Sequence, residues 1–189
     1  MKKSMTRKEK VLKTALQMVA AGGFQGAPIS ELAAKSKVAV GTIYHHFANK
    51  DEMVGAMYLM CKENLVGALT TALDGKATTS KRFEKMWEAF QGYSLTNGIE
   101  VSFLDQYNAS PLITADQQKA AEKMDLALVK FFADGIKSKD FAKGEANTHL
   151  EFFYTNAFAA ARKVGKGKKK NGPKEAEALR DLTWSALKK

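Results

Sequence analysis

The segment KVAVGTIYHHFANKDEMVGAMY, residues 37–58, constrains the fold more than any other part of the chain. Ile43 and Phe47 are four residues apart, so they share one face of a helix and can pack inward. Asn49 and Glu52 have the spacing of the N-cap and the third position of a capping box, which predicts that a second helix starts directly after Asn49. The segment is therefore expected to hold a short helix, a tight stop and the start of a longer helix.

A further short helix is predicted just before this segment. Pro28 suits the first turn of a helix, and the apolar side chains of ISELAAKS, which follows it, share one face. Gly41 is expected to let the next helix pack closely against this one. Two helices joined by a four-residue turn form the helix-turn-helix pattern, whose second helix lies in the major groove of DNA.

Polar side chains of the second helix are the candidates for DNA contacts. Thr42 and Tyr44 are assigned to phosphate or groove contacts, and His45 to a base edge or a phosphate. Lys50, with the amide groups that open the following helix, is expected to hold a phosphate, whereas His46 either contacts DNA or supports the fold. The predicted DNA-binding positions are Pro28, Lys37, Ala39, Val40, Gly41, Thr42, Tyr44, His45, His46 and Lys50.

Residues 22–53, preceded by a helix with VLKTALQMVA, resemble the DNA-binding module of TetR-type (TetR/AcrR) transcriptional repressors. Ala39 stands where the family often has a Ser that caps the recognition helix, which should weaken this helix start by roughly 1 kcal/mol. Val40 stands where the family has a polar residue, and it is suited to contact a thymine methyl group. The family pattern is matched by Gly23, Phe24, Ala33, Gly41, Thr42, Ile43, Tyr44, His46, Phe47 and Lys50.

This resemblance implies a fold, a set of partners and a mechanism. The expected fold is all-α, with a three-helix helix-turn-helix domain in residues 1–50 and a helical effector-binding and dimerisation domain in residues 51–189, joined by a long helix. A repressor of this kind binds a palindromic operator in double-stranded DNA as a homodimer and is released by a small hydrophobic or aromatic ligand. The alternatives are a constitutive DNA-organising protein without an inducer, and a carrier or enzyme with a vestigial DNA-binding module.

The charge distribution agrees with DNA binding. Residues 1–50 hold nine Lys or Arg against Glu9 and Glu31, a net charge of +7 out of +10 for the whole chain. The other 139 residues therefore carry only +3. Positive charge concentrated beside a helix-turn-helix is the pattern expected for phosphate contacts.

A reducing, cytoplasmic location is expected. The only cysteine, Cys61, excludes an internal disulfide and is predicted to be a buried thiol that fills space in the core. The basic start MKKSM is followed by TRKEK, where a signal peptide would need an apolar stretch. No window of 18 apolar residues occurs, so no membrane partner is expected.

Helical spacing continues through the rest of the chain, and no segment alternates like a strand. About nine helices are predicted in total, with the seventh as one continuous helix from Thr114 to Lys137. The expected ranges are about 7–21, 50–73, 80–95, 101–107, 114–137, 146–163 and 173 onward, with the two short helices before and after the four-residue turn lying between Pro28 and Asn49.

An aromatic-walled pocket for the small molecule is expected in the middle of the chain. If Glu100 or Asp105 faces into it, a cationic ligand becomes plausible through charge pairing and cation–π contact. The alternative is that the rings are simply core. The predicted ligand-binding residues are Phe83, Trp87, Phe90, Phe103, Tyr107 and Phe131.

The last two helices are expected to form the dimer interface. Apolar residues recur along them at spacings of three and four, so two helices from each of two chains could form a four-helix bundle. Alternatively, these seams bury against the core of their own chain. The predicted interface residues are Phe153, Ala157, Ala160, Val164, Leu179 and Leu182; the role of the intervening loop Lys166–Lys170 is not predicted.

Catalysis is not expected. His45 and His46 are neighbours on a helix and point about 100° apart, so they cannot share one metal ion. The sequence lacks a nucleophile elbow, a dinucleotide-binding fingerprint and a zinc-protease motif. No cofactor and no metal site are predicted.

Overall fold

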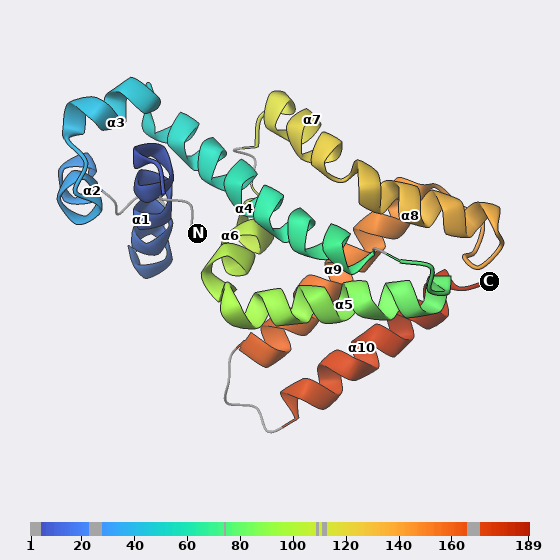
Figure 1. Cartoon of the computed structure of the whole chain (residues 1–189). Helices are drawn as coiled ribbons and strands as arrows, with labels where there is room; N and C mark the ends of the chain where they lie inside the picture. Colours follow the sequence, from blue (N-terminus) through green and yellow to red (C-terminus); the bar gives the residue numbers. More distant parts are fainter. Residues whose placement is uncertain (1–4, 23–27, 74, 109, 111–112, 166–170) are drawn as a thin grey trace.

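The computed structural model describes residues 5–22, 28–73, 75–108, 110, 113–165 and 171–189. These residues form ten helices and one isolated bridge, between Phe141 and Lys188, and no extended strand. Figure 1 shows a small N-terminal group of helices at one end of the long α4, and a larger helical group at the other end. The helices are α1 (Arg7–Gly22), α2 (Ile29–Ser36), α3 (Val40–His46), α4 (Lys50–Ala72), α5 (Thr79–Thr96), α6 (Gly98–Asn108), α7 (Ala115–Met124), α8 (Leu126–Lys137), α9 (Ala146–Gly165) and α10 (Gly172–Leu187).

The N-terminal group is held by a small apolar core. Leu32 of α2 and Ile43 of α3 are almost completely buried, and so are Val11 and Ala15 of α1. Phe47, which ends α3, is also buried, as its spacing from Ile43 predicts. The packing of α1 against α2 and α3 thus fixes the direction in which α3 presents its other face.

Only one half of the predicted capping box forms at the start of α4. The side chain of Asn49 accepts a hydrogen bond from the Glu52 amide at 2.8 Å. The Glu52 carboxylate in turn accepts from the amide of Ala48, at 2.7 Å. The first bond caps α4, which begins at Lys50. The Glu52 side chain instead binds the residue before the N-cap, not the Asn49 amide that a capping box requires.

The predicted single helix over 114–137 is wrong, because the chain turns at Asp125 and forms two helices, α7 and α8. The apolar spacing continues across the turn, so periodicity alone could not reveal it. The turn brings the Asp125 carboxylate within 2.7 Å of the Lys62 ammonium and 2.8 Å of the Tyr154 hydroxyl. The chain therefore has ten described helices rather than about nine.

Aromatic side chains form the core of the larger helical group. Phe153 of α9 is fully buried and packs edge-on against Phe83, Trp87 and Phe90 of α5, with ring centroids 5.8–6.3 Å apart. Edge-to-face contacts at these distances add to the hydrophobic stabilisation. The neighbouring rings that continue this cluster are Phe131, Phe132, Phe141, Phe158 and Trp184.

The C-terminal end of the chain is fastened to the segment after α8. The amide of Ala142 donates to the carbonyl of Leu187 at 2.8 Å, and the amide of Lys189 donates to the carbonyl of Asp140 at 3.2 Å. These two bonds join the C-terminal end of α10 to the segment that follows α8. The end of α10 cannot move away from that segment without breaking both bonds.

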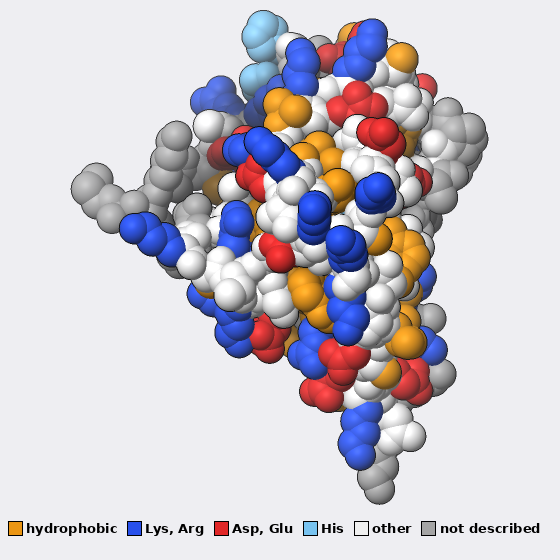
Figure 2. All heavy atoms as spheres, turned by 90° about the vertical axis from the view of Figure 1, so that its right-hand side faces the viewer, with side chains coloured by type: hydrophobic (Ala, Val, Ile, Leu, Met, Phe, Trp, Pro, Cys, Tyr) orange, Lys and Arg blue, Asp and Glu red, His pale blue; other side chains and the backbone are white. Residues whose placement is uncertain are grey.

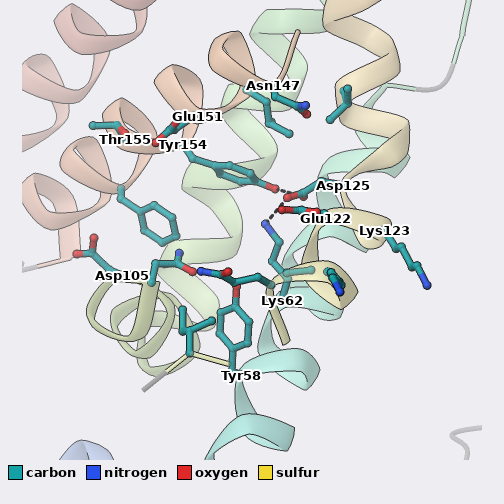
Figure 3. Close-up of a pocket in the computed structure, with 18 of the residues that line it drawn as sticks. Tyr58, Lys62, Asp105, Glu122, Lys123, Asp125, Asn147, Glu151, Tyr154 and Thr155 are labelled. Atoms are coloured by element: carbon teal, nitrogen blue, oxygen red, sulfur yellow. Dashed lines mark hydrogen bonds and ion pairs between the residues drawn. The ribbon is translucent and has the colours of Figure 1, made fainter. Parts of the chain in front are cut away.

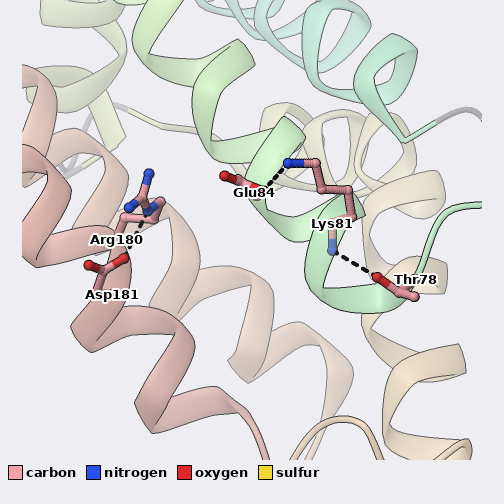
Figure 4. A network of polar contacts seen from close by, with 5 residues as sticks. All are labelled: Thr78, Lys81, Glu84, Arg180 and Asp181. Carbon is pink, nitrogen blue, oxygen red and sulfur yellow. Dashed lines mark hydrogen bonds and ion pairs between the residues drawn. The ribbon is translucent and has the colours of Figure 1, made fainter.

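The outer surface between α5 and α10 is polar. Figure 4 shows Glu84 of α5 bound to Lys81, with Arg180 of α10 nearby and bound to its neighbour Asp181. The hydrogen bond and the charge of Lys81 lower the pKa of the Glu84 carboxyl, and Arg180 adds to this effect. Thr78 caps the start of α5 by accepting from the Lys81 amide at 3.3 Å.

The packing of Phe141 against α8 makes a prediction about stability. A Cβ atom at Gly135 would lie 2.3 Å from a ring carbon of Phe141, whereas a Cβ atom at Gly92 of α5 would meet nothing within 4 Å. We expect Gly135→Ala to lower the free energy of unfolding by about 1–3 kcal/mol through overpacking. Gly92→Ala should instead raise it by about 0.5–1 kcal/mol, because Ala favours the helix. Urea unfolding of both variants measures the difference, and equal effects would contradict this packing.

Candidate DNA-binding surface and effector pocket

The third helix divides sharply into an inward and an outward face. Ile43 is 1% exposed, while Val40 and Tyr44 are 41% and 54% exposed. Both exposed side chains lie on the same helix as Thr42 and His45, which add a hydroxyl and an imidazole to this side of the molecule. The outward face of α3 thus offers apolar, aromatic and polar groups together.

The other predicted DNA-binding positions lie on the same side or at its edges. The turn between α2 and α3 spans three residues, 37–39, rather than the expected four. Lys37 has a left-handed backbone (φ 55°), and its amide donates to the carbonyls of Ala33 and Ala34. Pro28, Lys37, Ala39, Gly41 and His45 are exposed, and Thr42, His46 and Lys50 are half-buried.

Two local expectations about α3 have different outcomes. Ala39 makes no side-chain cap, as predicted, so the start of this seven-residue helix lacks that support. The expectation that Gly41 allows close packing against the preceding helix is wrong, because a Cβ atom there would meet nothing within 4 Å. Gly41 lies on the exposed face, where the small residue leaves room for an approaching partner.

A shallow hollow joins this face to the start of α1. It measures about 530 Å³ and is lined by Arg7 and Lys8 together with residues of α3. The Lys8 ammonium lies 5.6 Å from the centroid of the Phe47 ring, a cation–π contact that keeps it beside the helix-turn-helix. Sequence reasoning counted these two basic residues in the net charge but did not assign them to the site. The remaining lining residues are Thr6, Gly41, Thr42, His45 and His46.

The face at the opposite end of the molecule is electrostatically mixed. Figure 2 shows Lys and Arg side chains interspersed with Asp and Glu over the side where α8 and α10 end. The sequence agrees with this view, since residues 51–189 carry only +3 of the total charge. The positive charge available for phosphate groups is concentrated near α1 to α3.

A pocket of about 1010 Å³ opens between α4, α6, α7, α8 and α9. Figure 3 shows Tyr58 and Lys62 entering it from α4 and Tyr154 from α9. Apolar lining comes from Tyr58, Ile113, Ala121, Leu126, Val129, Leu150, Tyr154 and Phe158. Polar and charged lining comes from Lys62, Asp105, Asn108, Gln118, Lys119, Glu122, Lys123, Asp125, Asn147, Glu151, Thr155 and Arg162.

A buried ion pair lies at the inner end of this pocket. The Lys62 Nζ atom is 2.7 Å from Asp125 Oδ2, and the two side chains are only 9% and 15% exposed. Tyr154 donates its hydroxyl to Asp125 Oδ1 at 2.8 Å, and its ring centroid lies 4.2 Å from Lys62 Nζ. Burial, followed by the Asp125 charge, raises the pKa of Tyr154 well above its usual value, so the phenol remains a proton donor. Sequence reasoning missed all three residues, because they come together only through the turn at Asp125.

The acidic residues considered for a cationic ligand are already engaged. Asp105 lines the pocket, but Arg162 Nη1 lies 2.7 and 2.6 Å from its two carboxylate oxygens. Glu100 lies outside the pocket lining and accepts hydrogen bonds from Tyr93 and Asn64. Neither carboxylate is therefore an unpaired negative charge facing the pocket.

The six aromatic residues predicted to bind ligand are all part of the packed interior. Phe83, Trp87, Phe90, Phe103, Tyr107 and Phe131 are at most 4% exposed, and none lines the pocket. The physical reason is that the rings of α5, α8 and α9 pack against one another and leave no space between them. The pocket is therefore lined by other, more polar side chains.

The predicted dimer residues lie on two different faces. Phe153, Ala157 and Ala160 are fully buried in the core of their own chain, because this stripe of α9 packs against α5, α8 and α10. Val164 and Leu179 are half-buried, and Leu182 is 66% exposed. An adjacent face of α9 is more exposed. It carries Phe152, which is exposed, and Asn156 and Ala159, which are half-buried. The loop Lys166–Lys170 lies outside the described residues.

The remaining sequence features have simple outcomes. Cys61 is fully buried, as predicted, and burial together with Glu100 raises the pKa of its thiol, which makes it unreactive. Over the described ranges, no three His, Cys, Asp or Glu side chains cluster as metal ligands. None of the described helices is long and apolar enough to cross a membrane.

Comparisons with known proteins find a similar DNA-binding segment and a similar overall fold. Residues 11–57 match the bacterial regulatory proteins of the tetR family. A candidate tetR family transcription regulator from Shewanella sp. PV-4 shares the fold at 23% identity and a TM-score of 0.84, covering 98% of this chain and 100% of its own. A TetR-family transcriptional regulator from Haemophilus influenzae gives 21% identity and a TM-score of 0.80, with 97% of each chain covered. The ketosteroid transcriptional regulator KstR2 of Mycobacterium tuberculosis gives 16% identity and a TM-score of 0.66, covering 99% of this chain and 97% of its own.

The match covers the segment that builds the helix-turn-helix, and the shared fold extends over the whole chain. The helix-turn-helix segment is therefore similar to that of tetR-family regulatory proteins, and the fold of the whole chain is the one that these solved regulators share.

Proposed function

We propose that this protein is a repressor that binds a palindromic operator as a homodimer and is released when a small molecule fills the pocket. The observation that carries the proposal is the course of α4. This one helix begins at Lys50, beside the DNA-binding face, and contributes Tyr58 and Lys62 to the pocket. Lys50 and Lys62 are separated by about 18 Å of helix, at 1.5 Å per residue. A ligand that shifts α4 would therefore also shift the helix-turn-helix.

Residues 1–50 and 51–189 are the two functional units of this proposal. In the first, Val40, Thr42, Tyr44 and His45 of α3 meet the major groove, and Lys50 and the first amides of α4 hold a phosphate. Arg7 and Lys8 add phosphate contacts from the start of α1, since they line the hollow beside α3. Pro28, Lys37, Ala39, Gly41 and His46 complete the contact surface.

The dimer is proposed to form through the open faces of α9 and α10. Phe152 is 41% exposed and Leu182 is 66% exposed, and the small exposed residues Ala178 and Ala186 lie one turn on either side of Leu182. A patch that combines large and small apolar residues is suited to a helix bundle between two copies. Two-fold symmetry would place two recognition helices on successive turns of a palindromic site.

The proposal predicts that Tyr44→Ala abolishes operator binding without unfolding the dimer. The side chain is 54% exposed, so its loss removes contacts with DNA and little from the core. Fluorescence anisotropy on the operator measures binding, and circular dichroism checks the fold. Leu95→Ala, at a side chain 64% exposed on α5, is the matched control and should bind normally. Normal binding by Tyr44→Ala would mean that α3 does not read DNA in this orientation.

Lys50 is predicted to act on all DNA sequences alike. Lys50→Ala should weaken operator and scrambled DNA by the same factor and reduce the salt slope by about 1, because one phosphate contact is lost. Lys137→Ala, an exposed lysine at the far end of α8, should leave the slope unchanged. A change in sequence preference with an unchanged slope would instead assign Lys50 to a base edge.

The dimer interface is tested by placing a charge on it. Leu182→Glu should convert the protein to a monomer and lower its affinity for a palindromic operator by about 100-fold or more, because the two half-sites no longer act together. Light scattering after size exclusion measures the oligomeric state. Leu95→Glu introduces the same charge at an equally exposed leucine of α5 and should remain a dimer. A monomeric Leu95→Glu with a dimeric Leu182→Glu would move the interface away from α9 and α10.

The first experiment on the proposed function is anisotropy on the intergenic DNA next to the gene, compared with scrambled DNA, at physiological salt. A preference of roughly a thousandfold or more is expected for an operator. Equal, salt-sensitive binding to both DNAs, followed by genome-wide site selection that also finds no preferred site, would favour the alternative of a constitutive DNA-organising protein.

A further inference from the structure

The ammonium group of Lys62 has more donors than the protein satisfies. Within the part of the chain that the structure describes, Asp125 is the only hydrogen-bond acceptor that Lys62 reaches. The ring face of Tyr154 provides a second favourable contact, whereas an ammonium group carries three donors. The side chain is 9% exposed and lines the pocket, so any further acceptor must come from what enters the pocket.

The carboxylate of Asp125 is better satisfied. One oxygen accepts from Tyr154 and the other from Lys62. A cationic group that approached Asp125 would lie directly beside the Lys62 ammonium, which is 2.7 Å from that carboxylate. Like charges at such distances inside a protein repel strongly. The pair therefore favours an anionic or hydrogen-bond-accepting group over a cation.

Burial strengthens this preference. It lowers the pKa of Lys62, and the attraction of Asp125 opposes but does not outweigh that effect. A second negative charge near the ammonium would stabilise its charged form. The pair itself is formally neutral, so a group with one negative charge disturbs the site less than a doubly charged phosphate would.

The rest of the pocket suits an apolar body. Tyr58 and Ile113 lie along the pocket wall, and Leu126, Val129 and Phe158 are further apolar lining residues. Figure 3 places Tyr58 below Lys62 and Tyr154 above it, so an apolar group could lie against these rings while its polar end meets Lys62. A cavity of about 1010 Å³ has room for a small organic molecule.

We infer that the effector is a small organic acid whose carboxylate is bound by Lys62 and whose apolar body lies against Tyr58 and Phe158. This inference rests on the proposed function, and it defines the chemical class of the effector. The ligand carboxylate and Asp125 then both accept hydrogen bonds from the Lys62 ammonium. These charge-assisted hydrogen bonds select acids over neutral and cationic analogues.

Matched sets of ligands test the charge. The probes are benzoate, 3-phenylpropanoate and naphthalene-2-carboxylate, each compared with its primary amide and with the amine in which CH₂NH₂ replaces the carboxylate. Thermal melting of the full-length protein is the readout, because a ligand that binds only the folded state raises the melting temperature. At least one acid should raise it by several degrees, while the corresponding amide and amine raise it less.

Variants of the ion pair test the position. Lys62→Met should weaken the best acid about tenfold or more, because a charge-assisted hydrogen bond is lost. Since this change leaves the Asp125 carboxylate buried without a cationic partner, Lys62→Met combined with Asp125→Asn provides a neutral version that keeps an acceptor for Tyr154. It should fold and should not distinguish acid from amide. Lys130→Met removes the lysine of an exposed pair with Asp134 outside the pocket, and should bind the acid normally.

The single variant Asp125→Asn distinguishes a negatively charged ligand from a positively charged one. An acid held by Lys62 should still raise the melting temperature of this variant, whereas a cationic ligand held by Asp125 would be lost. Stronger shifts with the amines, equal shifts with acids and amides, no shift with any acid, or no shift with the best acid in Asp125→Asn would each overturn the inference.

Failure of this inference is distinguishable from failure of the proposed function. If an amine raises the melting temperature and releases the operator, the repressor model stands and the acid is excluded. If an acid binds at Lys62 but the protein shows no preferred DNA sequence, the pocket chemistry stands and the repressor model falls.

Discussion

The ion pair between Lys62 and Asp125 is the interaction on which the arrangement of the C-terminal helices depends. Lys62 belongs to α4, Asp125 to the turn between α7 and α8, and their common partner Tyr154 to α9. A buried ion pair adds little stability by itself, but removal of one partner is costly. The three helical segments are thus held in one relative position by groups that cannot easily exchange partners, and the pocket lies directly beside them.

The helix-turn-helix could be predicted because its determinants are local. The spacing of Ile43 and Phe47 and the N-cap residue Asn49 act within a few residues of one another, and the structure buries both apolar side chains and caps α4 with Asn49. The turn at Asp125 could not be predicted in this way. The partner of Asp125 at this turn is Lys62, 63 positions earlier in the sequence, while the local apolar spacing continues as in an unbroken helix.

The two predictions that depended on choosing a face illustrate the same limit. Both the stripe through Phe153 and the stripe through Phe152 of α9 contain apolar residues, so composition could not show which one faces the chain's own core. Likewise, the richness in aromatic residues indicated a site, but the rings found enough partners to fill their own space. The pocket is lined largely by polar residues, and in the sequence each of these residues resembles an ordinary surface position.

The missing cap of α3 has a consequence for the thermodynamics of recognition. A helix of seven residues without a side-chain cap is marginal by itself, and it is held in place chiefly by Ile43 and the adjoining Phe47. On the proposed function, the first turn with Ala39 and Val40 would gain order when DNA covers it. Part of the association would then be coupled folding, whose signature is a favourable enthalpy, an opposing entropy and a negative heat-capacity change. Sequence discrimination at the positions read by this first turn should therefore weaken as the temperature rises, sooner than at positions read from the well-anchored second turn.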